Sequence, residues 1–177
     1  YAVDWDGDGD LDFLSGNEDG TIIYFQNMGT TAEPSFIDQG VLNADAQVIH
    51  FPGEPVYEPL WGYTSLSVLD WDGDNDFDLM ISERTGQINY YENIGSSTNA
   101  ILTFIDALRH IDTSVILPNP RVKPAFYDWN NDGRIDIIMG TTNEQAAIYY
   151  NISLPGGVYF QSPNVLLDSQ GDPIYTE

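Results

Sequence analysis

A nine-residue acidic pattern, present three times, most constrains what this chain of 177 residues can fold into. The copies read DWDGDGDLD from Asp4, DWDGDNDFD from Asp70 and DWNNDGRID from Asp128. The last Asp of each copy is followed, always at the same distance, by an Asn: Asn27, Asn93 and Asn151. Because the spacing is kept this far beyond the pattern, one structural unit is used three times.

Short β-strands are predicted around each copy, because the flanking residues are apolar, β-branched or aromatic and no segment keeps a helical period. The expected strands are 12–15, 78–81 and 136–139 after the pattern, 21–26, 87–92 and 146–150 before the recurring Asn, and a further strand near Phe36, Phe104 and Phe160. Four short antiparallel strands in each repeat are typical of a propeller blade. We therefore expect an all-β chain, a β-propeller segment of about three four-stranded antiparallel blades.

The Pro-rich and Gly-rich connections suggest where one blade ends and the next begins. We expect the first blade, with a truncated first strand and a long connecting loop, in 1–62. The second blade is expected in 63–120, and the third, with the start of a further repeat, in 121–177. A three-bladed segment leaves open sheet surfaces, so we expect further blades of the same protein or other copies of the chain as partners.

Oxygen-bearing side chains stand at positions 1, 3, 5 and 9 of every copy, where a tight turn can aim them at one point. Hard oxygen ligands without His or Cys suit calcium better than zinc. Position 7, held by Asp10, Asp76 and Arg134, is expected to offer its backbone carbonyl and to point its side chain away. The pattern predicts about three calcium ions, one in each loop. The predicted side-chain ligands are Asp4, Asp6, Asp8 and Asp12, then Asp70, Asp72, Asp74 and Asp78, then Asp128, Asn130, Asp132 and Asp136.

Acidic loops of this kind also occur in EF-hands and in turns that bind no metal. An EF-hand needs a bidentate Glu at position 12 and flanking helices, whereas position 12 here is Ser15, Ile81 or Met139. A metal-free acidic turn stays possible, but the five carboxylates of the first loop would then raise one another's pKa values. Calcium binding would make the same crowding favourable.

The three loops, each followed by an apolar strand such as FLSG or IIMG and then an aromatic strand ending in Asn, resemble FG-GAP/VCBS repeats. The resemblance covers the loop and the two strands after it in each unit, which is roughly half of the chain. It implies a calcium ion held between the first two strands of each blade, where it mainly stiffens the fold. It also implies a secreted or cell-surface protein, in a location where millimolar calcium is available.

The net charge of the chain excludes some classes of binding partner. The chain carries 28 acidic residues against five Lys and Arg, a net charge of -23. Such a surface repels a phosphate backbone, so nucleic acid is not expected as a partner. No apolar run is long enough to cross a membrane, and membrane insertion is not expected. The chain contains no Cys, which leaves the redox compartment open.

Two functions fit these features. The first is a calcium-stabilised binding or scaffold module, acting in adhesion or in carbohydrate or protein recognition, with Tyr57, Trp61 and Tyr63 offering flat faces to a sugar ring. The second is a fragment of a propeller-fold polysaccharide lyase acting on acidic polysaccharide, for which His50, Tyr63 and Arg84 are the only candidate base and cation. No motif supports catalysis, so we expect a protein that is not an enzyme by itself. Trp5, Trp71 and Trp129 are expected to pack between sheets and the three Asn residues to cap turns.

Overall fold

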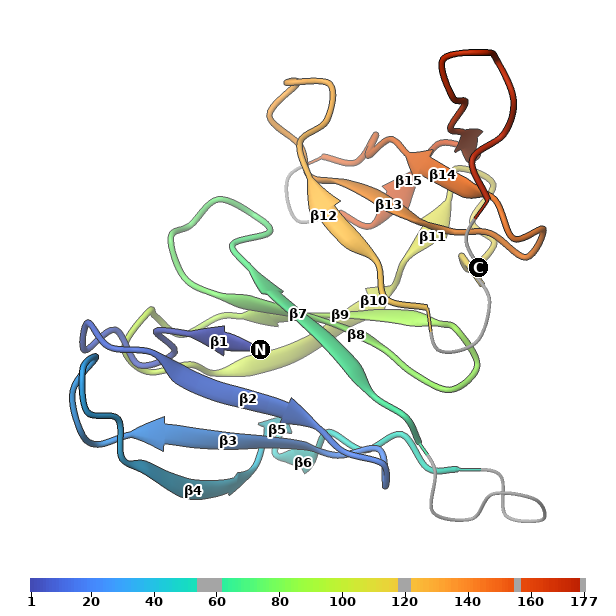
Figure 1. Cartoon of the computed structure of the whole chain (residues 1–177). Coiled ribbons are helices and arrows are strands. Elements are labelled where there is room, and N and C mark those ends of the chain that lie inside the picture. Colours follow the sequence, from blue (N-terminus) through green and yellow to red (C-terminus); the bar gives the residue numbers. More distant parts are fainter. Residues whose placement is uncertain (54–61, 118–121, 155–156, 176–177) are drawn as a thin grey trace.

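The computed structural model describes residues 1–53, 62–117, 122–154 and 157–175, and these residues form three larger β-sheets in chain order and one two-stranded sheet (Figure 1). The first sheet consists of β1 (Ala2–Val3), β2 (Asp12–Gly16), β3 (Ile22–Asn27) and β4 (Phe36–Val41). The second consists of β7 (Ser65–Leu69), β8 (Asp78–Ser82), β9 (Ile88–Asn93) and β10 (Leu102–Ala107), extended by β5 (Asn43–Ala44) and β6 (Gln47–Val48). The third consists of β12 (Ala125–Tyr127), β13 (Asp136–Gly140), β14 (Ala146–Tyr149) and β16 (Asn164–Val165). A separate two-stranded pair is formed by β11 (Arg109–His110) and β15 (Tyr159–Phe160).

The prediction of an all-β chain with four-stranded antiparallel sheets is confirmed. The described residues contain no helix, and hence none that could cross a membrane. Within these residues the sheets form an open stack and not a closed propeller. The long strand β10 lies where it was expected, around Phe104. In the third unit the expected strand at Phe160 is short and pairs with β11, while β16 takes the outer position of the sheet.

The connections between sheets are made by parallel pairing. After the first sheet, β5 runs alongside β10 with Ala44 opposite Leu102. After the second sheet, β11 runs alongside β15 with His110 opposite Phe160. The first connection thereby fastens the end of the first unit to β10, the fourth strand of the second unit, and the second connection fastens the end of the second unit to β15, which precedes β16 in the third unit.

A hydrogen-bonded hairpin follows the fourth strand of each unit. The backbone N–H of Leu42, Leu108 and Leu166 donates to the carbonyl of Ile22, Ile88 and Ala146, at 2.8, 2.9 and 2.8 Å. Further along the chain, the N–H of Ile49, Ile116 and Ile174 donates back to those three Leu residues, at 3.0, 2.8 and 2.9 Å. The repeat therefore continues through segments for which the sequence pattern predicts only connections.

Two hydrophobic cores join the three sheets. Leu14 and Ile22 of the first sheet pack with Leu79, Ile81 and Tyr91 of the second. The opposite face of the second sheet, with Met80, Ile88 and Tyr90, packs with the third sheet through residues that include Ile137, Ala147 and Tyr149. Because successive residues of a strand point to opposite faces, β8 and β9 serve both cores and β8 is buried along its whole length.

Candidate metal centres

The three acidic loops curl in the same way, because each first-position carboxylate accepts backbone N–H groups from the far side of its loop. Asp4 accepts from Gly9 at 3.1 Å, Asp70 accepts from Asn75 at 3.1 Å, and Asp128 accepts from Gly133 at 2.9 Å. These donors occupy position 6, where φ is +99° at Gly9, +73° at Asn75 and +84° at Gly133. Gly and Asn are the residues that adopt this left-handed backbone at low cost, so the prediction of a sharp turn there is confirmed.

Two of the loops gather carboxylates into a group that could hold a metal ion. Asp4, Asp6 and Asp8 each place one oxygen within 4.8 Å of the others, and Asp70, Asp72 and Asp78 do the same in the second loop. Carboxylate oxygens alone are the ligands of hard cations such as calcium. The two groups lie at the same end of their sheets, between the first two strands of each. The sequence had predicted all six of these residues as ligands. It had also predicted Asp12 and Asp74, which are not part of the two groups.

Several carboxylate oxygens in these loops lack hydrogen-bond partners although they are buried. Among the described residues they are Oδ1 of Asp4, Oδ1 of Asp10 and Oδ1 of Asp76. Burying a charged oxygen without a partner is costly. Asp4 belongs to the first carboxylate group, so a cation bound there would remove this cost; Asp10 and Asp76 lie in the same loops but outside the two groups.

The electrostatics of the second loop point the same way. Burial, with help from the charges of Asp74 and Asp72, raises the pKa of Asp76 to about 6. Burial raises the pKa of Asp78 to about 7, against the hydrogen bonds from Asn93 and Trp71 that lower it. Without a cation these side chains hold protons far above the usual range of an Asp. The free loop therefore disfavours the charged form of these carboxyl groups, and a bound cation would displace the protons and stabilise that charge.

The ninth position has a second role that the sequence reasoning missed. Asp78 accepts the backbone N–H of Trp71 at 2.9 Å and of Asn93 at 2.8 Å, and Asp12 and Asp136 accept from the corresponding residues of their own units. Each of these carboxylates is almost completely buried. The position-9 Asp thus ties the start of the loop to the end of the third strand. The constant spacing between this Asp and the recurring Asn was the signal for this contact.

Tyr and Gln side chains of the third strand also reach the acidic loops. Tyr24 donates its hydroxyl to Asp12 at 3.0 Å, and Tyr90 occupies the same place beside Asp78. Gln26 donates to Asp6 at 2.5 Å. Nothing in the nine-residue pattern identifies these residues, because they lie far from it in the sequence and are brought close only by strand pairing.

The third loop differs from the first two. Arg134 was expected to point away from the loop, but its guanidinium instead lies 2.7 Å from Asp132 and donates to the carbonyl of Asn151 at 3.0 Å. Asn130 also donates to Asp132, at 3.0 Å. Although desolvation raises the pKa of Asp132, the hydrogen bonds and charge supplied by Asn130 and Arg134 bring it below its usual value. No group of three acidic ligands forms in this loop among the residues that the structure describes.

The recurring Trp and Asn residues lie where they were expected, with one exception. Trp5 and Trp71 are buried in the two cores, whereas Trp129 is 52% exposed. Asn27 and Asn93 each accept two backbone N–H groups from the connection to the fourth strand, and Asn151 accepts one. The turn-capping role of the Asn residues is confirmed.

The candidate lyase residues each make a hydrogen bond to a backbone carbonyl: His50 and Tyr63 to the β2–β3 turn, and Arg84, in the β8–β9 turn, to Gly62. His50 Nε2 lies 3.1 Å from the carbonyl of Asp19, the N–H of Tyr63 donates to Glu18, and the N–H of Arg84 donates to Gly62. These hydrogen bonds explain the positions of the three residues but do not indicate a catalytic role for them. Tyr57 and Trp61, the other aromatic residues of the proposed recognition loop, lie outside the described residues.

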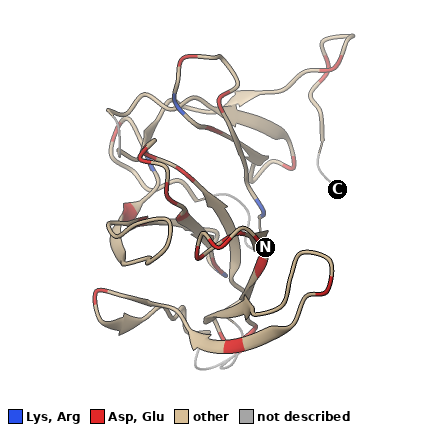
Figure 2. Ribbon diagram, turned by 90° about the vertical axis from the view of Figure 1, so that its left-hand side faces the viewer, with Lys and Arg blue, Asp and Glu red and all other residues tan. Residues whose placement is uncertain are grey.

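Comparison with known proteins adds no relative: a scan against protein-family models matches none, and a search of curated proteins finds no significant match. Acidic residues are distributed over all three sheets and their loops, and few residues are basic (Figure 2). The case for the metal centres therefore depends on the geometry of the loops.

Proposed function

We propose that this chain is a calcium-stabilised binding or scaffold module built from propeller-type repeats of the FG-GAP/VCBS kind, and that it works outside the cell. The observation that carries the proposal is the recurrence of one loop geometry, twice with three carboxylate oxygens within 4.8 Å of one another. Hard oxygen ligands and the buried, unpartnered oxygens beside them favour calcium. The proposed sites lie in the connections between strands, so the ion's role is to stiffen each sheet.

The acidic surface supports the same assignment. A module with a net charge of -23 repels itself unless cations neutralise part of the charge. Two or three bound calcium ions would reduce this repulsion where it is densest, inside the loops. Weak sites with dissociation constants of about 0.1–1 mM suit extracellular modules, because calcium is abundant there.

Thermal unfolding with calcium and with a chelator tests the proposal. A ligand that binds only the folded state adds about 2.7 kcal/mol to the free energy of unfolding when its concentration is 100 times its dissociation constant. We expect the melting temperature to rise with calcium in the wild-type protein. Coincident melting curves would refute the structural-metal assignment.

Two neutralising variants and a control assign the effect to the loops. Asp8→Asn and Asp72→Asn keep an oxygen that can accept the backbone N–H now bonded to each carboxylate, but remove the charge. Each should lower the calcium stoichiometry by one in a calorimetric titration. Asp172→Asn, which removes the same charge from an exposed position outside the loops, should leave the stoichiometry unchanged. An equal loss in all three variants would show that calcium responds only to overall charge.

A further inference from the structure

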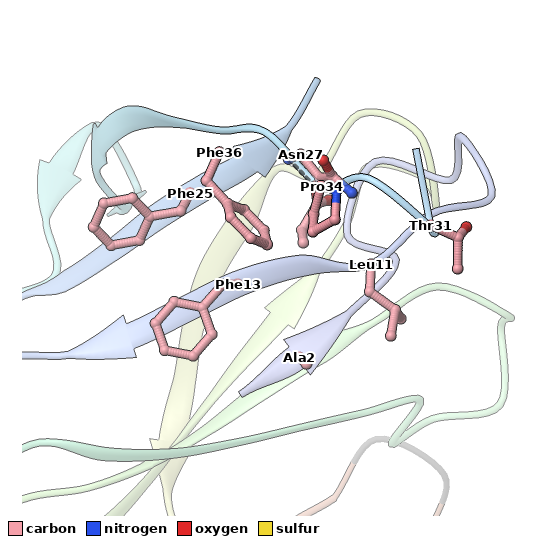
Figure 3. A pocket seen from close by; sticks show the side chains of 9 residues that line it. Ala2, Leu11, Phe13, Phe25, Asn27, Thr31, Pro34 and Phe36 are labelled. Carbon is pink, nitrogen blue, oxygen red and sulfur yellow. Dashed lines mark hydrogen bonds between the residues drawn. The ribbon is translucent and has the colours of Figure 1, made fainter. Parts of the chain in front are cut away.

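The first sheet exposes the face that corresponds to a buried face in the second and third sheets. Three aromatic residues of this face, Phe13, Phe25 and Phe36, are called here the Phe face. Phe13 is 42% exposed and Phe36 is 51% exposed. Together with neighbouring residues they line an open apolar groove of about 560 Å³ (Figure 3). Phe13 and Phe25 stand beside each other, with ring centroids 6.1 Å apart.

Strand pairing identifies the counterparts of these residues in the other sheets. Phe13 pairs with Phe25 as Leu79 pairs with Tyr91 and as Ile137 pairs with Tyr149. Phe36 lies opposite the recurring Asn of its unit, as Leu102 and Phe160 do in theirs. All the counterparts are buried in the two cores, where each is covered by the preceding sheet. The Phe face is therefore the surface on which a preceding sheet would pack. None of the described residues forms such a sheet there.

The third sheet exposes the opposite half of the same interface. Tyr127, Trp129 and Ile174, called here the Trp face, are 65%, 52% and 42% exposed. Their counterparts in the first unit are Val3, Trp5 and Ile49, which all lie in the first core. The second unit has Leu69, Trp71 and Ile116 at these places, packed in the second core. Trp129 and its neighbours thus match the side chains that twice cover a following sheet within this chain.

We propose that the Phe face of one copy of this chain receives the Trp face of a second copy, so that copies associate head to tail. The interface would repeat the arrangement already formed twice inside the chain, between the first and second sheets and between the second and third. Because the two surfaces differ, the contact is heterologous, and repeated contacts give a ring if the rotation closes and a filament if it does not. The proposal goes beyond the function proposed above and does not require that the loops bind calcium.

A second copy is favoured as the occupant because one chain carries both complementary surfaces. An apolar peptide or a sugar would explain the Phe face but not the exposed Trp129.

The contacts that the acidic loops make within the chain are also consistent with head-to-tail association. Within the chain, Trp71 donates its indole N–H to Gly157 of the following sheet at 3.3 Å, and Gly7 lies against Ser97, where an added Cβ would come within 2.9 Å of the carbonyl oxygen. Each of these acidic loops thus meets the connection after the third strand of the next sheet.

Charge complementarity supports this docking. In a head-to-tail pair the third loop would meet the connection between β3 and β4 of the next copy, which carries Glu33. The third loop is the one in which Arg134 replaces the acidic residue found at position 7 of the other two, Asp10 and Asp76. The substitution removes a negative charge and adds a positive one at the loop that would face another molecule. Repulsion between two chains of net charge -23 opposes the contact, and salt of about 0.15 M screens it beyond about 8 Å.

The test uses two variants that each disable one face. Phe13→Glu disables the Phe face and Trp129→Glu disables the Trp face, and both residues are exposed, so neither change disturbs a core. Ile111→Glu, at an apolar residue that is 66% exposed and belongs to neither face, is the matched control. Melting curves of all variants check that each is folded. Sedimentation is then measured from about 1 µM to about 1 mM protein, in 0.15 M salt, with calcium and with chelator.

We expect the wild type and the Ile111→Glu variant to exceed the monomer mass of 19.8 kDa as concentration rises, while each face variant alone stays monomeric. An equimolar mixture of the two face variants should form a dimer and nothing larger, because it offers one intact pair of faces. A wild-type chain that stays monomeric to about 1 mM would overturn the proposal and leave the Phe face to a different ligand. Dimers formed by the Trp129→Glu variant alone would also overturn it, since they would show that Phe faces dock on each other.

Discussion

The second and third units of this chain share a pattern, a turn and a buried position-9 Asp, yet they differ in charge and in packing. In the second unit, Asp70, Asp72 and Asp78 gather their oxygens, and burial raises the pKa of Asp78. In the third, Asn130 and Arg134 already stabilise the charge of Asp132. The comparison distinguishes two features of the repeat. The first is a hydrogen-bonded frame, formed by the position-9 Asp and the two backbone N–H groups that it accepts, which every unit has. The second is a cation site, which depends on the side chains that each loop carries.

The largest difference between the two units should appear on truncating the position-2 Trp. Trp71 is 7% exposed and contacts the rings of Tyr90, Phe126 and Phe160, so Trp71→Ala should cost about 3–5 kcal/mol in the free energy of unfolding. Trp129→Ala should cost less than about 0.5 kcal/mol, because its side chain is half exposed. Denaturant unfolding at low protein concentration, where copies do not associate, measures both. Equal costs would mean that Trp129 is also buried in solution.

Because both units have this frame, removing its Asp should cost the same stability in each. Asp78→Ala removes the acceptor of two buried backbone N–H groups, and Asp136→Ala removes the acceptor of the equivalent two. Each unpartnered N–H costs about 1–3 kcal/mol. Measured with chelator present, the two variants should therefore lose similar amounts of stability. A loss confined to Asp78→Ala would show that the frame of the third unit is not equivalent.

The three loops are expected to bind calcium with unequal affinity, and substitutions in the third loop should reduce the difference. The third loop should bind calcium most weakly and lose it first on dilution or chelation, because it offers fewer carboxylates and contains Arg134. Converting it to the charge pattern of the second loop, with Asn130→Asp and Arg134→Asp together, should tighten that site by about tenfold, or about 1.4 kcal/mol. Calorimetric titration resolves the sites. A third site that is the tightest in the wild type would contradict the ordering.

The same comparison shows what could be predicted from the sequence. The spacing of the acidic pattern predicted the strands, the turn residues and the carboxylate groups of the first two loops, because all of these are local. The contact of Arg134 with Asp132 depends on a side-chain rotamer and on the carbonyl of Asn151, which strand pairing brings near. The hairpins at Ile49, Ile116 and Ile174 were missed because their spacing varies between units and their motif is only a pair of apolar residues. The burial of Trp5 and Trp71 but not Trp129 depends on which sheet lies next to each, and no property within a unit specifies that.

The last expected effect is a dependence of stability on pH in the metal-free protein. In the folded second loop the pKa of Asp76 is about 6 and that of Asp78 about 7, whereas an unfolded Asp titrates near pH 4. Between about pH 4 and pH 7 the folded state therefore binds more protons than the unfolded state, so the free energy of unfolding falls as pH rises through this window. With chelator, the melting temperature should be higher at pH 5 than at pH 7.5.

Two variants assign this slope to the second loop. Asp76→Asn removes one of the raised groups and should flatten the slope. Asp132→Asn should not flatten it, because the pKa of Asp132 is lowered and its contribution is lost only as pH falls below the usual range of an Asp. Saturating calcium should reverse the trend, since the ion competes with the protons that the carboxylates hold at low pH. If Asp132→Asn flattened the slope as much as Asp76→Asn, the dependence would come from the general repulsion of an acidic chain and not from the second loop.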